Sequence, residues 1–176
     1  MKKILLLLLI SGTICTQDID DVWTVENKGS IILASVNGKI TYGDRLIFLF
    51  SKSTPCDEPQ WITSFYSTQN EVEKKIENLN IEYLNITLNE VVKTYANIIS
   101  VSPFLMGSIT QMYIGRYPIK KIQESFGLLE EISIELISIP KTDTDIESIY
   151  DITKNTFSTT NLNEALEQAK ADCLKL

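Results

Sequence analysis

Histidine is absent from the 176 residues of this chain, and its absence limits the chemistry that the other side chains can perform. Serine–histidine–aspartate and cysteine–histidine catalysis, histidine-ligated zinc and histidine proton relays are all excluded. The seven glycines are scattered singly, so no glycine-rich loop can cradle a phosphate. Carboxylate chemistry, lysine chemistry or an active-site Ser or Thr with an unusual base remain.

Three acidic clusters are the candidates for carboxylate chemistry. One of them, Asp18, Asp20 and Asp21, follows the N-terminal apolar segment, and we expect it to be solvated charge. The segment 143–147 carries three carboxylates that could gather around Ca²⁺, but it lacks the glycine and the distant bidentate glutamate of a calcium loop. We therefore expect a solvated loop that enters a helix at Ile146. Glu130 and Glu131 are neighbours, and adjacent side chains on a strand point to opposite faces, which argues against an acid–base pair. The sequence predicts no catalytic residue, no metal site and no cofactor.

An aromatic-rich set of residues is the strongest candidate for binding. Trp61, Tyr66, Tyr113 and Arg116 could form a face for a glycan, a peptide or another protein. On a strand Trp61 and Phe65 share one side and Tyr66 lies on the other, so core positions for Trp61 and Phe65 stay open as an alternative. A surface ion pair explains Arg116 as well as a ligand anchor does.

The first fifteen residues predict export. Two lysines precede an unbroken apolar run at 4–10, and small and polar residues follow it, which is the pattern of a secretory signal peptide. A membrane-spanning helix would need about 20 apolar residues. We expect cleavage before Thr16, leaving residues 16–176 as one domain. The alternative is a lipoprotein acylated at Cys15.

The net charge restricts the partners. The chain has 16 basic and 23 acidic residues, and removal of Lys2 and Lys3 with the signal peptide takes the formal charge from −7 to −9. Such an acidic balance argues against nucleic acid and anionic membranes as partners. We expect a protein or an envelope component as the partner, and membrane attachment only if Cys15 is lipidated. The oligomeric state is not predicted.

Two cysteines, Cys56 and Cys173, remain in the expected mature chain. In an oxidising compartment such an isolated pair is most simply a disulfide, although two buried free thiols are an alternative. The C-terminal pattern supports the disulfide, because Asn161 and Glu164 can cap a helix whose apolar face includes the second cysteine. That face carries Leu162, Ala165, Leu166, Ala169 and Cys173.

Short apolar segments separated by turn residues predict a mainly β fold. Asn37-Gly38 favours a tight hairpin between two of them. The segment 70–80 is ambiguous, although Val72, Ile76 and Leu79 fit a helical stripe, and 84–88 alternates as a strand does. Whether 70–108 is helical stays open. We expect an antiparallel β-sandwich or curled sheet with a C-terminal helix packed on it. The expected strands are 22–25, 31–36, 39–42, 45–50, 61–66, 84–88, 112–117 and 132–136.

Several landmarks recur along the chain in a set order: Trp23, Leu46-Ile47-Phe48, Cys56, Arg116, Phe157-Ser158, Leu162, Ala165-Leu166 and Cys173. Their order resembles that of secreted bacterial β-sandwich proteins of the invasion-associated locus B type and of their relatives linked to type VI secretion. The chain departs from their pattern at 70–108, which has the character of an insertion, and in lacking additional cysteines. The resemblance implies an exported accessory or host-interaction protein and supplies no catalytic residues.

Taken together, these features predict an exported, non-enzymatic binding or accessory protein of the bacterial envelope. The composition, rich in Lys, Ile and Asn, is typical of an AT-rich bacterial or phage genome. Two alternatives stay open. One is an envelope hydrolase that brings two carboxylates together in one pocket. The other is a phage- or plasmid-encoded envelope factor acting on a membrane or secretion component.

Overall fold

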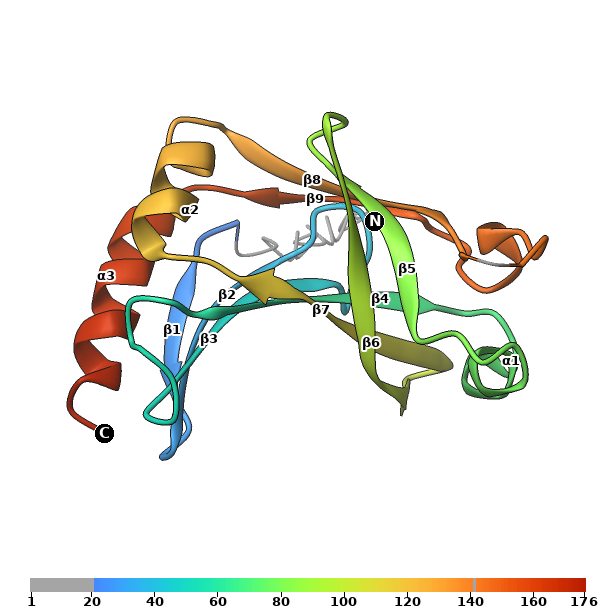
Figure 1. Cartoon of the computed structure of the whole chain (residues 1–176), viewed down its shortest axis with the longest axis horizontal. Helices are drawn as coiled ribbons and strands as arrows, with labels where there is room; N and C mark the ends of the chain where they lie inside the picture. Colours follow the sequence, from blue (N-terminus) through green and yellow to red (C-terminus); the bar gives the residue numbers. More distant parts are fainter. Residues whose placement is uncertain (1–20, 141) are drawn as a thin grey trace, which may run out of the picture.

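The computed structural model describes residues 21–140 and 142–176, which form one curled antiparallel sheet of nine strands with three α-helices (Figure 1). The predicted signal peptide and Cys15 lie outside the described residues. The strand order is β1-β2-β3-β4-β7-β6-β5-β8-β9. The strands are β1 (Thr24–Asn27), β2 (Ile31–Asn37), β3 (Arg45–Ser51), β4 (Gln60–Ser67), β5 (Tyr83–Leu88), β6 (Val92–Phe104), β7 (Gly107–Arg116), β8 (Glu131–Ser138) and β9 (Lys154–Ser158). The helices are α1 (Val72–Asn78), α2 (Ile119–Phe126), α3 (Leu162–Cys173) and the 3₁₀ turn η1 (Ile146–Ser148).

The expected mainly β architecture is confirmed, in its curled-sheet form. The two ends of the sheet approach each other, because Gly38, just after β2, forms a β-bridge with Phe157 of β9. The amide of Lys39 donates to the carbonyl of Thr156 at 2.9 Å. The indole N–H of Trp23 donates to the carbonyl of Ser158 at 2.7 Å. These contacts cover the outer edge of β9, which would otherwise expose unpaired backbone groups.

The core lies inside the curl and follows from the alternation of side chains along each strand. The inward-facing residues of the surrounding strands are buried and mostly apolar, with Thr63, Thr110 and Asn155 as buried polar exceptions. The residues between them lie on the outer face of the sheet. The inner set includes Ile32, Val36, Phe48, Phe50, Trp61, Phe65, Leu84, Ile86, Met112, Ile132, Ile134 and Phe157.

Helices close the two ends of the curled sheet. In Figure 1, α2 and α3 lie at one end and α1 at the other. The predicted face of α3 is buried, and the helix packs against β1, β2 and β3. The predicted cap is wrong, because Asn161 has a left-handed backbone (φ 62°) and its side chain caps no amide. None of the helices in the described ranges has the length and apolar character needed to cross a membrane.

The structure contains the predicted disulfide between Cys56 and Cys173. It joins the β3–β4 loop to the end of α3, with Cα atoms 5.9 Å apart and a sequence separation of 117. Such a bond is typical of proteins that fold outside the reducing cytoplasm, and it indicates a non-cytoplasmic environment for this chain.

The expected strand at 39–42 is not formed, and neither is the Asn37-Gly38 hairpin. Strand β2 pairs with β3 only up to Asn37, opposite Arg45, and residues 38–44 form a wider loop. The reason is a competing partner, because the amide of Ile40 donates to Oδ1 of Asn155 at 3.0 Å. The ambiguous segment 70–108 contains the short helix α1, as its stripe predicts, and then β5 and the long strand β6.

Candidate functional site

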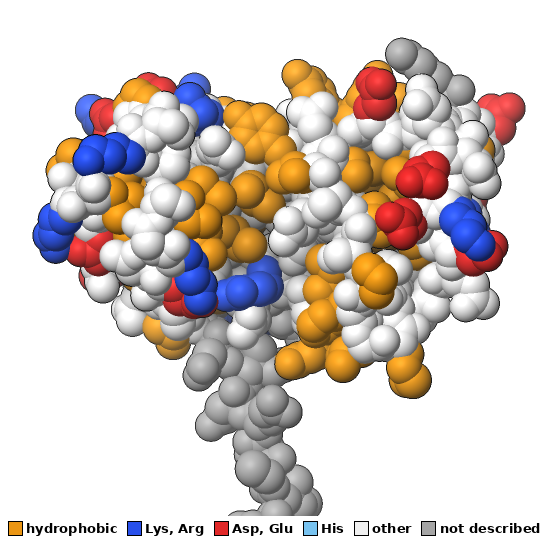
Figure 2. Space-filling model, turned by 90° about the horizontal axis from the view of Figure 1, so that it is seen from below, with side chains coloured by type: hydrophobic (Ala, Val, Ile, Leu, Met, Phe, Trp, Pro, Cys, Tyr) orange, Lys and Arg blue, Asp and Glu red, His pale blue; other side chains and the backbone are white. Residues whose placement is uncertain are grey.

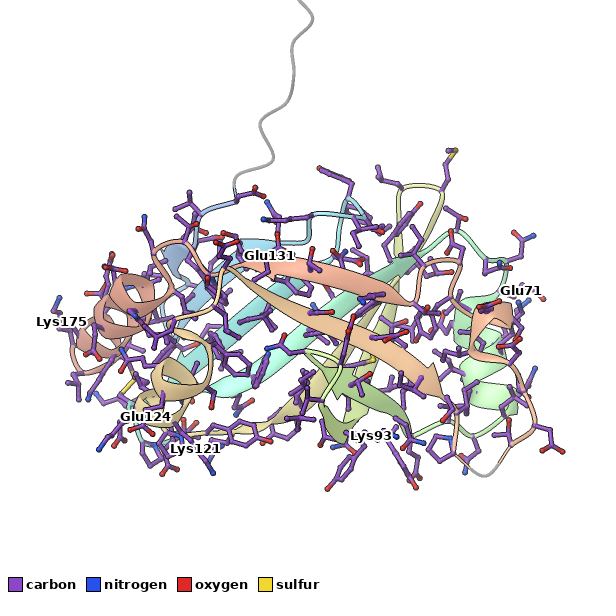
Figure 3. The ribbon with its side chains drawn as sticks, turned by 90° about the horizontal axis from the view of Figure 1, so that it is seen from above. Glu71, Lys93, Lys121, Glu124, Glu131 and Lys175 are labelled. Carbon is purple, nitrogen blue, oxygen red and sulfur yellow. A yellow bond between two sulfur atoms is a disulfide. The ribbon has the colours of Figure 1, made fainter. Side chains whose placement is uncertain are left out.

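An apolar pocket lies between α2 and the β5–β6 turn. Its volume is about 320 Å³, at the lower end of the range of small-molecule sites, so it fits a compact or single-chain molecule and not a full diacyl lipid. In Figure 3 the labelled Lys121 of α2 and Lys93 of β6 lie along the same edge of the molecule, on the two elements that border this pocket. The lining residues are Trp61, Leu88, Asn89, Val91, Val92, Tyr117, Lys121, Ile122, Ser125 and Phe126.

Helix α2 supplies one wall of the pocket. Pro118 precedes its first residue with φ −55°, a geometry that suits a helix start. Ile119, Ile122 and Phe126 recur at helical spacing and are buried. The amide of Ile119 donates to the carbonyl of Asp57 at 2.8 Å. Because Asp57 follows the disulfide-bonded Cys56, the disulfide and the start of this wall are held by the same loop.

Trp61 lies at the floor of the pocket, among aromatic rings. Its ring centroid is 5.3 Å from that of Phe126 and 6.0 Å from that of Tyr117, both in edge-on geometry, and 5.7 Å from that of Phe48. Such tilted and edge-on pairs stabilise a packed aromatic cluster beyond the area they bury. The floor is therefore a preformed, apolar surface.

The indole N–H of Trp61 is a polar group within this otherwise apolar cluster. The residue is 3 % exposed, and its Nε1 has no hydrogen-bond partner among the described residues. A buried indole N–H normally finds an acceptor, as that of Trp23 does at the carbonyl of Ser158. Nε1 is itself inaccessible to solvent, so this donor is buried and has no acceptor among the described residues.

The β5–β6 turn supplies the opposite rim. Asn89 and Glu90 have left-handed backbones, with φ 49° and 61°. Asn89 is fixed to β8, since its Oδ1 accepts from the amide of Ser133 at 2.7 Å. This turn presents Val91 and Val92, which are exposed at the rim. The rim is therefore apolar and held in place by hydrogen bonds to a neighbouring strand.

The four predicted ligand-binding residues do not lie on one surface. Trp61 is on the inner face of β4, whereas Tyr66 lies on the outer face of that strand. Tyr113 is partly buried on the outer side of β7, opposite Ile62. Arg116 is exposed at the end of β7. The structure thus brings Trp61 alone of the four into the pocket, and ligand binding by the others stays a prediction.

Most of the pocket residues were not identified from the sequence. Ile119, Ile122 and Phe126 carry a readable helical stripe directly after Pro118, and this stripe could have revealed α2. Nothing local indicates that α2 lies against the β5–β6 turn, because that contact depends on the curl of the whole sheet.

A second, polar cavity of about 480 Å³ lies beside Lys39. It is lined in part by Asp21, Glu130 and Glu131. The ammonium of Lys39 bonds Oε1 of Glu131 at 2.6 Å and lies 3.8 Å from Asp21, and its pKa is raised by the hydrogen bond to Glu131. The side chains of Asp21 and Glu131 are partly exposed, and the positive charge of Lys39 lies close to both carboxylates.

The segment 143–147 forms the loop expected there. Asp145 precedes η1, and its Oδ1 accepts from the amide of Glu147 at 3.2 Å. No group of three or more potential metal ligands occurs among the described residues.

Asp44 is the buried carboxyl of the fold. It is 1 % exposed, and burial raises its pKa to about 7, against the opposing effect of hydrogen bonds from Asn155 and from the amide of Tyr66. Both of its oxygens are used by these bonds, at 2.7 Å and 2.6 Å. Asp44 lines neither cavity described above. Its role is therefore to hold the loop 38–44 against β4 and β9.

Comparison with known proteins supplies no relative: no family model, no curated protein and no solved structure matches this chain. Fold and geometry define the class on their own, as a disulfide-bonded, curled antiparallel sheet with a preformed apolar pocket at one edge.

Proposed function

We propose that this chain is an exported, non-enzymatic binding protein of the bacterial envelope, and that it holds a small apolar molecule over Trp61. The observation that carries the proposal is the preformed pocket of about 320 Å³, which is walled mostly by aliphatic and aromatic side chains. A ligand with an apolar body matches this lining, because it would fill the pocket and contact its aliphatic and aromatic side chains.

The absence of acids from the pocket lining favours binding over hydrolysis. Lys121 is the charged residue among the ten that line it, and Asn89 and Ser125 are the uncharged polar ones. General acid–base catalysis by paired carboxylates needs two acids within reach of one substrate. The hydrolase therefore remains an alternative whose acids would have to lie in the cavity beside Lys39.

The disulfide supports the export part of the proposal. A Cys56–Cys173 bond that closes most of the chain forms and persists in an oxidising compartment. The signal-peptide pattern at 1–15 agrees with this location, either in the periplasm or outside the cell.

The test is mass spectrometry of the protein recovered from an envelope fraction without detergent. We expect a mature mass that starts at Thr16, two hydrogens lighter before reduction, and a non-covalent adduct of one small molecule in the native spectrum. Ser125→Trp places a large ring at the pocket mouth and should abolish the adduct. Lys120→Trp, on the same helix but outside the pocket lining, is the matched control and should retain it.

The two parts of the proposal fail separately. An uncleaved chain with free thiols in the cytoplasmic fraction would contradict export. An exported chain with no adduct, and with no binding of an added apolar fluorophore that Ser125→Trp weakens, would contradict the pocket as a binding site.

A further inference from the structure

The β6–β7 hairpin is free of charge over an unusual length. No Asp, Glu, Lys or Arg occurs from Thr94 to Gly115, although 22 % of the chain is charged. Strand β7 pairs with β4 along most of its length, whereas β6 pairs with β5 only from Val92 to Asn97. From Thr94 to Gly115 the hairpin therefore exposes only uncharged side chains to its surroundings.

The turn of this hairpin presents large apolar side chains to solvent. Leu105 is 74 % exposed and Met106 is 93 % exposed. The turn is built to hold them there: Leu105 has a left-handed backbone with φ 51°, and a Cβ on Gly107 would lie 2.1 Å from the carbonyl oxygen of Ser67. Single exposed apolar residues are ordinary, but two at the tip of a structurally constrained turn form a protruding apolar point.

An aromatic platform supports this tip. The ring of Phe104 stacks on Tyr42, with centroids 6.2 Å apart, and meets the ring of Tyr66 edge-on at 6.0 Å. Tyr42 is 71 % exposed, and Ile40 on the same loop is also exposed. The loop 38–44 and the hairpin turn therefore form one continuous surface, which we call the apolar tip: Ile40, Tyr42, Phe104, Leu105 and Met106.

The apolar tip lies on the side of the molecule where the described chain begins. Asp21 is 3.8 Å from the ammonium of Lys39, which lies in the same loop as Tyr42. In Figure 3 the hairpin turn and the start of the coloured chain lie along the same edge. Figure 2 shows hydrophobic side chains gathered at the lower right of the opposite view, with no charged side chain among them.

We propose that the apolar tip inserts into the interfacial region of a lipid bilayer of neutral headgroups. Leu105 and Met106 enter the acyl boundary, and Tyr42 lies at headgroup level, where amphipathic rings are favoured. Insertion desolvates no charge of the hairpin. The net charge of −7 selects neutral over anionic lipid. This membrane contact goes beyond the proposed function, because the pocket over Trp61 is built from α2 and the β5–β6 turn.

The shape of the tip favours a bilayer over a second copy of the chain. A stable protein interface buries about 800 Å² on each partner with complementary shape. A narrow turn that projects two side chains offers little of that area, whereas a bilayer accepts a protruding apolar point without a shaped counterpart.

The test uses Met106→Trp in the full chain as a fluorescent reporter of how deeply the turn inserts into the bilayer. Both native tryptophans are buried, at 4 % and 3 % exposure, so an introduced indole dominates the quenchable emission. With vesicles of brominated phosphatidylcholine we expect a blue shift and quenching. Leu128→Trp is the matched control at a site that is 97 % exposed and outside the tip, and its emission should stay unchanged.

Flotation with phosphatidylcholine vesicles gives the second readout. Leu105→Ser combined with Met106→Ser should lower the partition coefficient about tenfold or more, given the transfer free energy of two large apolar side chains. Leu128→Ser with Leu174→Ser removes two exposed leucines elsewhere and should leave it unchanged.

Three results would overturn the proposal. The Met106→Trp emission could be insensitive to vesicles. It could be quenched no more than that of Leu128→Trp, which would place the membrane contact elsewhere on the chain. Its blue shift could depend on protein concentration without lipid, which would identify a second copy of the chain as the occupant.

Discussion

The side-chain amide of Asn155 donates a hydrogen bond of 2.7 Å to Oδ2 of Asp44, joining two buried residues that are 111 positions apart in the chain. Oδ1 of Asp44 accepts from the amide of Tyr66, and Oδ1 of Asn155 accepts from the amide of Ile40. These bonds connect β9, at one end of the sheet, to the loop after β2 and to β4. The closure of the curled sheet therefore depends on a buried carboxyl.

The first prediction is that Asp44 makes the stability of the protein fall as the pH rises from about 4 to about 7. Burial raises its pKa from 3.8 in the unfolded chain to about 7 in the folded one, so the folded state binds the extra proton in this range. Its stabilising contribution is full below the unfolded pKa and is lost through the folded pKa, with a change of about 4 kcal/mol for a shift of this size. Relative to Asp44→Asn, the wild type should lose this amount between pH 4 and pH 7 in urea titrations.

A surface acid provides the control for this measurement. The hydrogen bond from Lys74 holds the pKa of Glu71 below its usual range, so the contribution of Glu71 has the opposite sign and appears as the pH rises. Glu71→Gln should therefore not reproduce the effect of Asp44→Asn. Parallel pH profiles for the wild type and Asp44→Asn would contradict the prediction.

The second prediction concerns the disulfide. Cys173→Ser opens a loop of 117 residues and should lower the free energy of unfolding by about 4–5 kcal/mol in the chain-entropy model. For a domain of this size that corresponds to a fall in Tm of roughly 10–15 °C. The reduced wild type should melt with the variant, and Cys56→Ser combined with Cys173→Ser should melt no lower than either single variant. A reductant that leaves the Tm of the wild type unchanged would contradict the prediction.

The third prediction concerns the start of β7. In Gly107→Ala the added Cβ would meet the carbonyl oxygen of Ser67 at 2.1 Å, and that oxygen belongs to the backbone of β4 and cannot rotate away. We expect a loss of about 1–3 kcal/mol in the free energy of unfolding, as for other overpacked sites. Ser108→Ala, one residue further on, removes no recorded hydrogen bond and should change stability little. Equal stability of the two variants in chemical denaturation would show that the turn can relax.

The sequence predicted the elements whose signals are local. Ile132, Ile134 and Leu136 alternate with polar residues, and they form the inner face of β8. Leu162 to Cys173 carries its apolar face at helical spacing, and that face is buried in α3. The same face, together with the count of cysteines, identified the disulfide. In each case the period of the side chains alone decides which face is buried.

The predictions from the sequence are wrong where a residue that is distant in the sequence determines the local structure. Asn37-Gly38 favours a tight turn, but the backbone amide of Ile40 donates to the side chain of Asn155 instead. Asn155 also packs closely on Gly38, since a Cβ there would lie 2.5 Å from its side-chain amide nitrogen. The residues predicted to accompany Trp61 in a site differ from those around the pocket for a related reason. Trp61 was placed in an aromatic face with Tyr66 and Tyr113, whereas the pocket joins it to α2 and to the β5–β6 turn through the curl of the sheet.

The last prediction compares the two buried tryptophans, which differ in the hydrogen bonding of their indoles. Trp23 donates to the carbonyl of Ser158 at 2.7 Å, whereas Nε1 of Trp61 has no partner among the described residues. Both Trp23→Phe and Trp61→Phe lose buried volume, but only the first also leaves a buried carbonyl without its donor. We expect Trp23→Phe to cost about 1–2 kcal/mol more in the free energy of unfolding, measured in urea on ligand-free protein. Equal costs for the two variants would contradict the prediction and would show that the indole of Trp61 also has an acceptor.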